Sequence, residues 1–362
     1  LYDTDTLNQG LYFGPYRITE VNSGSHVVLQ PNPTWWGNKP HFKKVVIQIV
    51  ENTAALEANL LSGSISYIAG ELGLSLDQGI AFAKRHGKNF NIQFKPGLVY
   101  EHLDLNLENP FLADRRVRQA LIRSIDRNQI TKKLFDGRQP VANSFVNPLD
   151  WIFDKNTPRY RYDPARANAL LDSAGWQKRD GDGYRINQKD VRLSFELMTT
   201  AGNRSRELVQ QILQSQWRKV GIEIRIRNEP ARVYFGETVT KRKFKAMAMF
   251  AWLSAPESVP RQTLHSNHIT TAANNWSGQN YTSYKNPEVD KLLDGIELEL
   301  DREKRRILWA RLQKTYAEDL PVIPLFFRAD PFITPKWLKG INPTGHQDPT
   351  TLWIEEWRAE KP

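Results

Sequence analysis

The spacing of apolar residues predicts that helices and strands alternate along the middle of the chain. Across residues 208–217 the apolar side chains recur every three or four positions, as in a helix with one buried face. Gly221 then ends the helical pattern, and isoleucines at every second position from 222 to 226 indicate a strand. Residues 191–199 also alternate as a strand before the helix. A strand, a helix and a strand in succession predict an α/β fold.

Residues that favour helix ends support this interpretation. Asp114 is placed to cap a helix whose apolar residues fall at helical spacing, and Asp126 with Gln129 has the pattern of a capping box for the next helix. A later helix is predicted between an N-cap aspartate with a following proline and a C-terminal glycine, namely Asp163, Pro164 and Gly175. The sequence therefore predicts several helices with defined ends.

Composition limits the class of protein. A chain of 362 residues with 40% hydrophobic residues and 11 tryptophans is long enough for two lobes with separate cores. The chain has no cysteine, which excludes disulfides and thiolate chemistry. The formal net charge of +10 raises the possibility of a nucleic-acid partner, but the basic clusters are separated and diluted by acids, so we expect solvated helix faces and no nucleic-acid binding.

Motifs for catalysis or metal binding are weak. The chain lacks the spaced motifs of a nucleophile elbow, a phosphate loop, a dinucleotide fold or a zinc protease. Residues 180–183 faintly match a calcium loop, but Val191 stands where a bidentate glutamate is required, which favours a turn. His265 and His268 could share a metal, although a surface pair is favoured because no third ligand has a suitable spacing. We expect no enzyme activity, no cofactor and no metal.

Several ordered motifs carry a resemblance to a known family. Asn-Pro-Thr-Trp-Trp-Gly at residues 32–37 follows Gly-Pro-Tyr at 14–16 and precedes a predicted helix at 54–63. Similar matches continue through the chain at residues 111–126, 162–176, 284–293 and 320–325. Together these segments resemble the extracellular solute-binding proteins of the peptide and nickel type, bacterial family 5, which serve ABC importers.

The resemblance implies an α/β, two-lobed fold like that of the periplasmic binding proteins (type II, cluster C). It places hinge crossings near residues 106–111 and 334–336. Lobe two would be residues 111–335, and lobe one would be residues 1–110 plus 336–362. Because family members carry a further N-terminal segment, we expect lobe one to be incomplete and an export signal to be absent from this chain. A periplasmic location, with or without a lipid anchor, follows from the family.

The resemblance also suggests ligand-binding residues. Peptide binders of the family place an aspartate shortly after a tryptophan, where it pairs with the ligand's ammonium group; Trp252 matches, but the aspartate position falls at Ala255. Glu257 could substitute for it. The arginine that dipeptide binders use for the ligand carboxylate is also missing from residues 199–204, and Arg204 and Arg206 are expected to face solvent. The ligand would then be a longer or blocked peptide, or a solute that is not a peptide.

Other candidate contacts are amides and aromatics, suited to hydrogen bonding and stacking. They are Trp276, Asn280 and Tyr281, with Asn106 and Tyr234 as weaker candidates; packing in lobe two is the alternative role of these aromatics. The resemblance thus implies a monomeric substrate-binding subunit that captures a peptide or peptide-like solute and delivers it to ABC permease subunits. The alternatives are a two-lobed hydrolase, with a nucleophile and base near Trp252 and Asn280, or a binder of a nickel complex or small glycoside.

Overall fold

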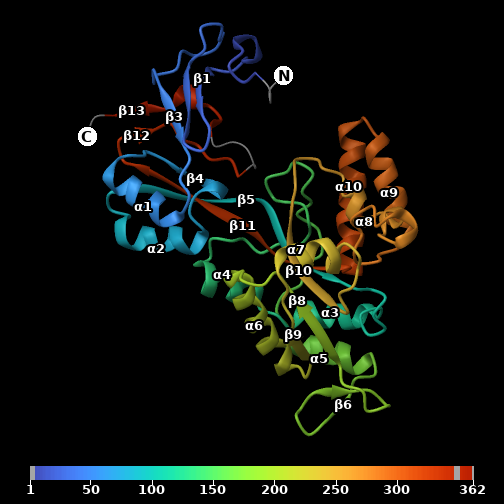
Figure 1. The fold of residues 1–362 in the computed structure, drawn as a ribbon. Helices are drawn as coiled ribbons and strands as arrows, with labels where there is room; N and C mark the ends of the chain where they lie inside the picture. Colours follow the sequence, from blue (N-terminus) through green and yellow to red (C-terminus); the bar gives the residue numbers. More distant parts are fainter. Residues whose placement is uncertain (1–4, 346–350, 361–362) are drawn as a thin grey trace. The chain divides into compact units, whose positions relative to one another are not determined.

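The computed structural model describes residues 5–345 and 351–360 (Figure 1). The chain forms two units, one comprising Leu1–Gly97 and Ala329–Pro362 and the other Leu98–Arg328. The changes from one unit to the other occur within two long strands, β5 (Phe90–Leu105) and β11 (Val322–Pro335). The lobe and hinge boundaries expected from the sequence lie further along the chain, and they stay a prediction.

The first unit is built around an antiparallel sheet in the order β1-β2-β3. Tyr16 at the start of this sheet is buried with residues close to the C-terminus, among them Leu338 and Trp357. The other elements include two helices and short strands, of which β4 pairs with the later part of β11. The bounds are β1 Tyr16–Asn22, β2 His26–Pro31, β3 Val45–Gln48, α1 Thr53–Ser62, β4 Ile68–Ala69, α2 Leu76–His86, β12 Leu338–Lys339 and β13 Arg358–Ala359.

The tryptophan-containing motif at residues 32–37 is held by hydrogen bonds to nearby residues of the same unit. The buried Asn32 side chain donates to the carbonyl oxygens of Tyr12 and Gly14 and accepts from the Thr34 backbone N–H. A Cβ atom on Gly37 would lie only 2.5 Å from the Trp35 ring, which explains the glycine. The motif therefore organises a turn after β2.

The second unit contains the strands that position the candidate site. β5 lies between β11 and β10, and β8 and β9 continue the sheet beyond β10. β10 is antiparallel to β5 and parallel to β8, and β8, α6 and β9 form the predicted strand–helix–strand unit with parallel strands. The bounds are α3 Arg115–Arg123, α4 Arg127–Phe135, α5 Pro164–Ser173, β6 Lys178–Arg179, β7 Arg185–Ile186, β8 Ser194–Met198, α6 Arg204–Lys219, β9 Glu223–Ile226, α7 Ala231–Val233, β10 Met247–Leu253, α8 Arg261–Leu264, α9 Pro287–Leu298 and α10 Arg302–Asp319.

Most predicted helix ends are confirmed. The side chains of Asp114, Asp126 and Asp163 each accept a hydrogen bond from a backbone N–H in the first turn of α3, α4 and α5. The prediction of a capping box at α4 is wrong for one of its two hydrogen bonds, the one from the Asp126 N–H to the Gln129 side chain. The Asp126 N–H donates to Oε1 of Gln216 on α6 at 2.7 Å, so a distant residue replaces the predicted partner Gln129.

The long helix α6 buries the predicted stripe. Trp217 is fully buried, and its indole N–H donates to the Leu121 carbonyl oxygen on α3 at 2.9 Å. Residues 180–183 form the predicted turn, in which Asp180 and Asp182 pair with Arg192. Within residues 5–345 and 351–360, no helix is long and apolar enough to cross a bilayer.

Candidate functional site

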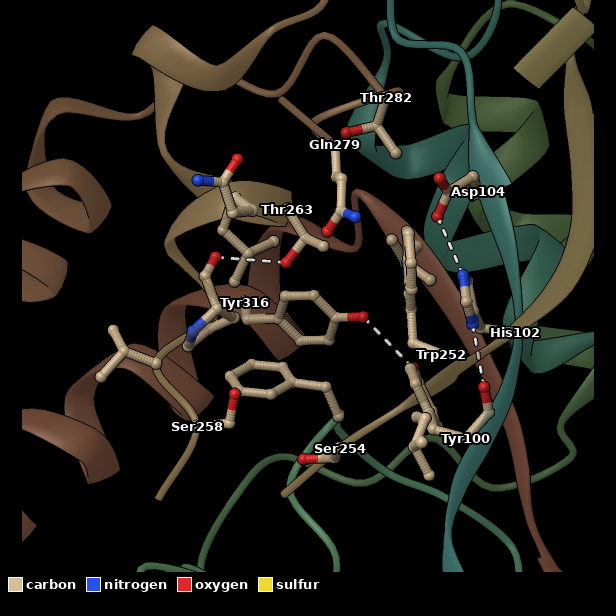
Figure 2. Close-up of a pocket in the computed structure, with 17 residues that line it drawn as sticks. Tyr100, His102, Asp104, Trp252, Ser254, Ser258, Thr263, Gln279, Thr282 and Tyr316 are labelled. Carbon is tan, nitrogen blue, oxygen red and sulfur yellow. Dashed lines mark hydrogen bonds and ion pairs between the residues drawn. The ribbon is translucent and has the colours of Figure 1, made fainter. Parts of the chain in front are cut away.

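A cavity of about 210 Å³ lies within the second unit, bordered by β5, β10, the loop and helix after β10, and α10 (Figure 2). Apolar and aromatic residues form much of its wall: Tyr100, Phe145, Trp252, Leu253, Val259, Pro260, Leu264, Tyr316 and Val322. Polar groups complete the lining: His102, Asp104, Ser254, Ser258, Gln262, Thr263, Gln279 and Thr282. A largely apolar cavity with a few polar groups is the usual form of a small-molecule site.

The strand pairing explains why these residues meet. Tyr100, His102 and Asp104 are two residues apart on β5, so their side chains share one face of the sheet. Trp252 on β10 lies directly opposite Tyr100 in the antiparallel register. The Trp252 ring also stacks on Tyr281, with ring centres 6.1 Å apart and an interplanar angle of 22°. This wall of the cavity is therefore held by the sheet.

His102 and Asp104 form a buried polar pair in the wall. Nδ1 of His102 lies 3.1 Å from the Tyr100 carbonyl oxygen, and because a carbonyl only accepts, this nitrogen carries a proton. Nε2 lies 3.2 Å from Oδ1 of Asp104, a close contact that is not aligned as a hydrogen bond, and it makes no hydrogen bond with any described residue. The exposed fractions of the two side chains are 1% and 5%. The two side chains therefore form a close polar contact that is shielded from solvent.

The hydroxyl groups of Tyr100 and Tyr316 meet at 3.2 Å beside this pair (Figure 2). Burial raises the pKa of the Tyr100 hydroxyl, and it raises the pKa of Tyr316 as well. Both groups stay neutral at physiological pH. They offer the cavity hydrogen-bonding groups without charge.

Glu101 points to the other face of β5 and holds two arginines. Nη2 of Arg206 lies 3.1 Å from Glu101 Oε1, and Nε of Arg328 donates to the same oxygen at 2.8 Å. Burial alone would raise the pKa of Glu101, but the charges of Arg328 and Arg206 outweigh it and lower this pKa. The expectation that Arg206 faces solvent is therefore wrong, because its side chain is buried in an ion pair with Glu101. Arg204 is exposed, as expected.

Of the seven ligand-binding residues predicted from the sequence, Trp252 lines the cavity. Tyr281 is buried and supports it by stacking on its ring. The Tyr234 hydroxyl is fully buried and donates to the carbonyl oxygens of Met198 and Met249. These positions place Trp252 at the cavity and the two tyrosines in the packing around it.

The two predicted asparagines hold the backbone. The two N–H groups of the Asn280 amide lie at hydrogen-bonding distance from the carbonyl oxygens of Leu264, His265 and Tyr284, and the amide oxygen accepts from Thr282 and Tyr284. Asn106 donates to the Phe244 carbonyl and accepts from the Glu108 N–H. Both amides are occupied by contacts within the protein.

Glu257 and Trp276 lie away from the cavity lining. The Glu257 carboxylate accepts from the Trp151 indole at 2.6 Å and pairs with Arg305 at 3.1 Å. Trp276 is half-buried and has a positive φ of 59° in a turn. The Glu257 carboxylate would have to leave two partners to reach a ligand's ammonium group.

Tyr100, His102, Asp104 and Tyr316 line the cavity but were not predicted from the sequence. A signal existed on β5, where a histidine and an aspartate two residues apart lie in the buried stretch of residues 100–105. Polar groups buried on one face of a central strand need partners or a cavity.

The geometry around His102 does not form a catalytic triad. In such a triad one ring nitrogen faces the acid and the other faces a nucleophile. Here the second nitrogen donates to the Tyr100 backbone. In the described part of the chain, no cluster of three or more histidine, aspartate or glutamate residues is arranged to hold a metal, and His265 instead lies 3.7 Å from both Asp290 and Asp294.

Comparisons with known proteins give relatives over nearly the whole chain. The oligopeptide-binding protein AppA of Bacillus subtilis is 27% identical over 351 residues, covering 96% of this chain and 62% of AppA. The dipeptide-binding protein of Escherichia coli is 22% identical, covering 86% of this chain and 54% of that protein. The chain thus spans little more than half to three fifths of the length of these relatives.

Solved structures agree. An oligopeptide-binding protein from Thermus thermophilus, complexed with a pentapeptide, is 33% identical with a TM-score of 0.70, covering 92% of this chain and 60% of that one. NikZ from Campylobacter jejuni, in complex with Ni(L-His), is 26% identical with a TM-score of 0.73, covering 96% and 68%.

These likenesses confirm the predicted α/β fold of the periplasmic-binding-protein type. The family model for bacterial extracellular solute-binding proteins, family 5 (middle), matches residues 2–273. The chain therefore belongs to the family 5 bacterial extracellular solute-binding proteins.

Proposed function

We propose that this chain is the ligand-capturing part of an ABC importer's substrate-binding subunit, and that its ligand is a peptide longer than a dipeptide. The observation that carries the proposal is the preformed cavity at Trp252, held by the β5–β10 register. Relatives named for oligopeptide binding support the ligand class. We further propose that the protein is exported, acts as a monomer, delivers its ligand to membrane permease subunits and catalyses no reaction.

The ends of a short peptide find few charged partners here. Ala255 stands where peptide-binding relatives place an aspartate, and the nearby Glu257 carboxylate is held by Trp151 and Arg305. A buried ammonium group without a counter-charge costs several kcal/mol. Longer peptides gain affinity from backbone hydrogen bonds and side-chain burial, which do not depend on those anchors.

Isothermal titration calorimetry of this chain with unblocked dipeptides and pentapeptides tests the proposal. We expect measurable binding of pentapeptides, much weaker binding of dipeptides, and loss of pentapeptide binding in Trp252→Ala. Tight dipeptide binding would contradict the proposed ligand length. Binding of a nickel–histidine complex but no peptide would overturn the peptide assignment.

A further inference from the structure

We propose that the cavity accepts a neutral aromatic side chain with a polar tip, tyrosine or tryptophan, from the bound peptide, and that His102 supports this preference by occupying the Asp104 carboxylate. This inference rests on the proposed function for its ligand, but the cavity and its residues lie wholly within the second unit.

The size of the cavity fits one large side chain. Its volume is about 210 Å³. An engineered apolar cavity of about 150 Å³ in another protein binds benzene, so this one has room for an aromatic ring and a polar substituent. A small side chain would leave much of the space to water or void, and would bury little apolar surface.

The walls favour a ring over an aliphatic chain. Phe145 packs edge-on against Tyr316, with ring centres 4.9 Å apart and an interplanar angle of 82°. Trp252 forms another wall and is fixed by its stacking on Tyr281. Aromatic pairs in such geometries gain energy beyond their buried area. A guest ring can therefore pack against the faces and edges of aromatic rings whose positions the protein already fixes.

The electrostatics disfavour charged guests. Asp104 is the one carboxylate that lines this cavity, and the lining contains no lysine or arginine. Oδ1 of Asp104 lies 3.2 Å from Nε2 of His102, and both side chains are buried, so this carboxylate oxygen faces the imidazole ring. A guest lysine would have to compete with His102 for the carboxylate, and a guest glutamate meets no lysine or arginine in the lining. Burying either charge is costly.

Polar atoms remain available for the tip of the ring. The Thr282 hydroxyl donates to Asn280 and keeps its lone pairs as acceptors. In Figure 2 the Gln279 amide points into the same space. An O–H or indole N–H from the guest would find an acceptor there, whereas a guest without a polar tip would leave these groups unpaired.

The direct test uses small blocked amino acids, which need only the cavity. The N-acetyl methylamides of tyrosine, leucine and lysine are titrated into the 362-residue chain, and binding is followed by ligand-observed NMR. We expect the tyrosine probe to bind about tenfold more tightly than the leucine and lysine probes. Equal affinity for the three probes, or a preference for lysine, would overturn the inference.

The role of His102 is tested by removing its nitrogens while keeping a ring. His102→Phe leaves Asp104 without its partner, so we expect affinity for the lysine probe to rise by about tenfold. Adding Asp104→Asn in the same chain should abolish this gain. His102→Gln provides a second variant if the phenylalanine disturbs folding, and His86→Phe on α2 is the control that should keep the wild-type preference. An unchanged lysine affinity in a folded His102→Phe or His102→Gln chain would contradict the masking role.

The outcomes separate the two proposals. If the tyrosine probe binds selectively but no peptide is captured, the proposed function fails and the cavity's selectivity stands. If pentapeptides bind with the same affinity whatever side chains they carry, the proposed function stands and the side-chain preference fails.

Discussion

Trp217 and Trp252 are both large indoles in the second unit, and their surroundings assign them different tasks. Trp217 is fully buried between α6 and α3, where its N–H has a backbone partner. Trp252 is half-buried and presents one side to the cavity. Trp217 therefore serves packing, and Trp252 serves the binding that we propose.

Substituting each tryptophan with alanine should separate stability from binding. Trp217→Ala should lower the free energy of unfolding by about 3 to 5 kcal/mol, because it leaves a large void and removes the indole's hydrogen bond to the Leu121 carbonyl. Trp252→Ala should lower it less and weaken ligand binding more. Urea unfolding and calorimetry on both variants provide the measurements. Similar losses of stability together with normal binding in Trp252→Ala would contradict the assignment.

Glu101 should make the stability depend on pH in the acid range. Its pKa in the folded chain is lowered, so its stabilising effect is present above its ordinary pKa and is lost as the pH falls through the folded value. Glu101→Gln leaves Arg206 and Arg328 without their carboxylate, and should cost about 3 kcal/mol at neutral pH.

Unfolding measured from about pH 7 down to about pH 3 should show a smaller gap between the wild type and Glu101→Gln as the solution becomes acidic. Other carboxylates titrate in both chains, so the difference between the two curves isolates Glu101. A constant gap across this range would exclude the ion pair as its source.

At the scale of elements, the helix ends follow from local sequence signals, whereas the candidate site depends on contacts between residues far apart in the chain. The N-caps at Asp114, Asp126 and Asp163 were predictable because each contact lies within one helical turn. The contact between Gln216 and the start of α4 was not predictable, because Gln216 lies 90 residues from Asp126 along the chain.

The cavity wall was missed for the same reason. Whether His102 and Asp104 face a cavity depends on how β5 pairs with β10, which lies far along the chain, and no local pattern specifies that register. Trp252 was predictable only through the resemblance. Arg206 was misplaced because its partner Glu101 lies 105 residues away.

Gln216→Leu should show how much the contact between α6 and α4 contributes to the free energy of unfolding. The change leaves the Asp126 N–H without its acceptor, so we expect a loss of about 1 to 3 kcal/mol in the free energy of unfolding. Gln211→Leu, at an exposed position on the same helix, is the matched control and should change stability by about 0.5 kcal/mol or less. Equal effects of the two variants in urea titrations would show that this contact contributes nothing special.

At the scale of the whole molecule, the two units should differ in local stability. Strands β1 and β3, the two outer strands of the β1-β2-β3 sheet, leave apolar side chains such as Val21, Val46 and Ile47 close to half exposed. In the second unit, β8 and β10 contain fully buried residues such as Phe195 and Met247. Few buried contacts permit local opening.

Hydrogen exchange followed by mass spectrometry should therefore find the amides of β1–β3 exchanging well before those of β8 and β10. Trp217→Ala offers an internal check, because it should accelerate exchange in the second unit while leaving β1–β3 almost unchanged. Equal protection of both sheets in the wild type would contradict this difference.

The central claim, that this chain captures peptides, is tested most directly by native mass spectrometry of the 362-residue chain mixed with peptides of two to six residues. The account predicts complexes with peptides of three or more residues, enriched in those that contain tyrosine or tryptophan, and almost none with dipeptides. A spectrum with no intact peptide complexes, or with peptides cleaved by the protein, would contradict it.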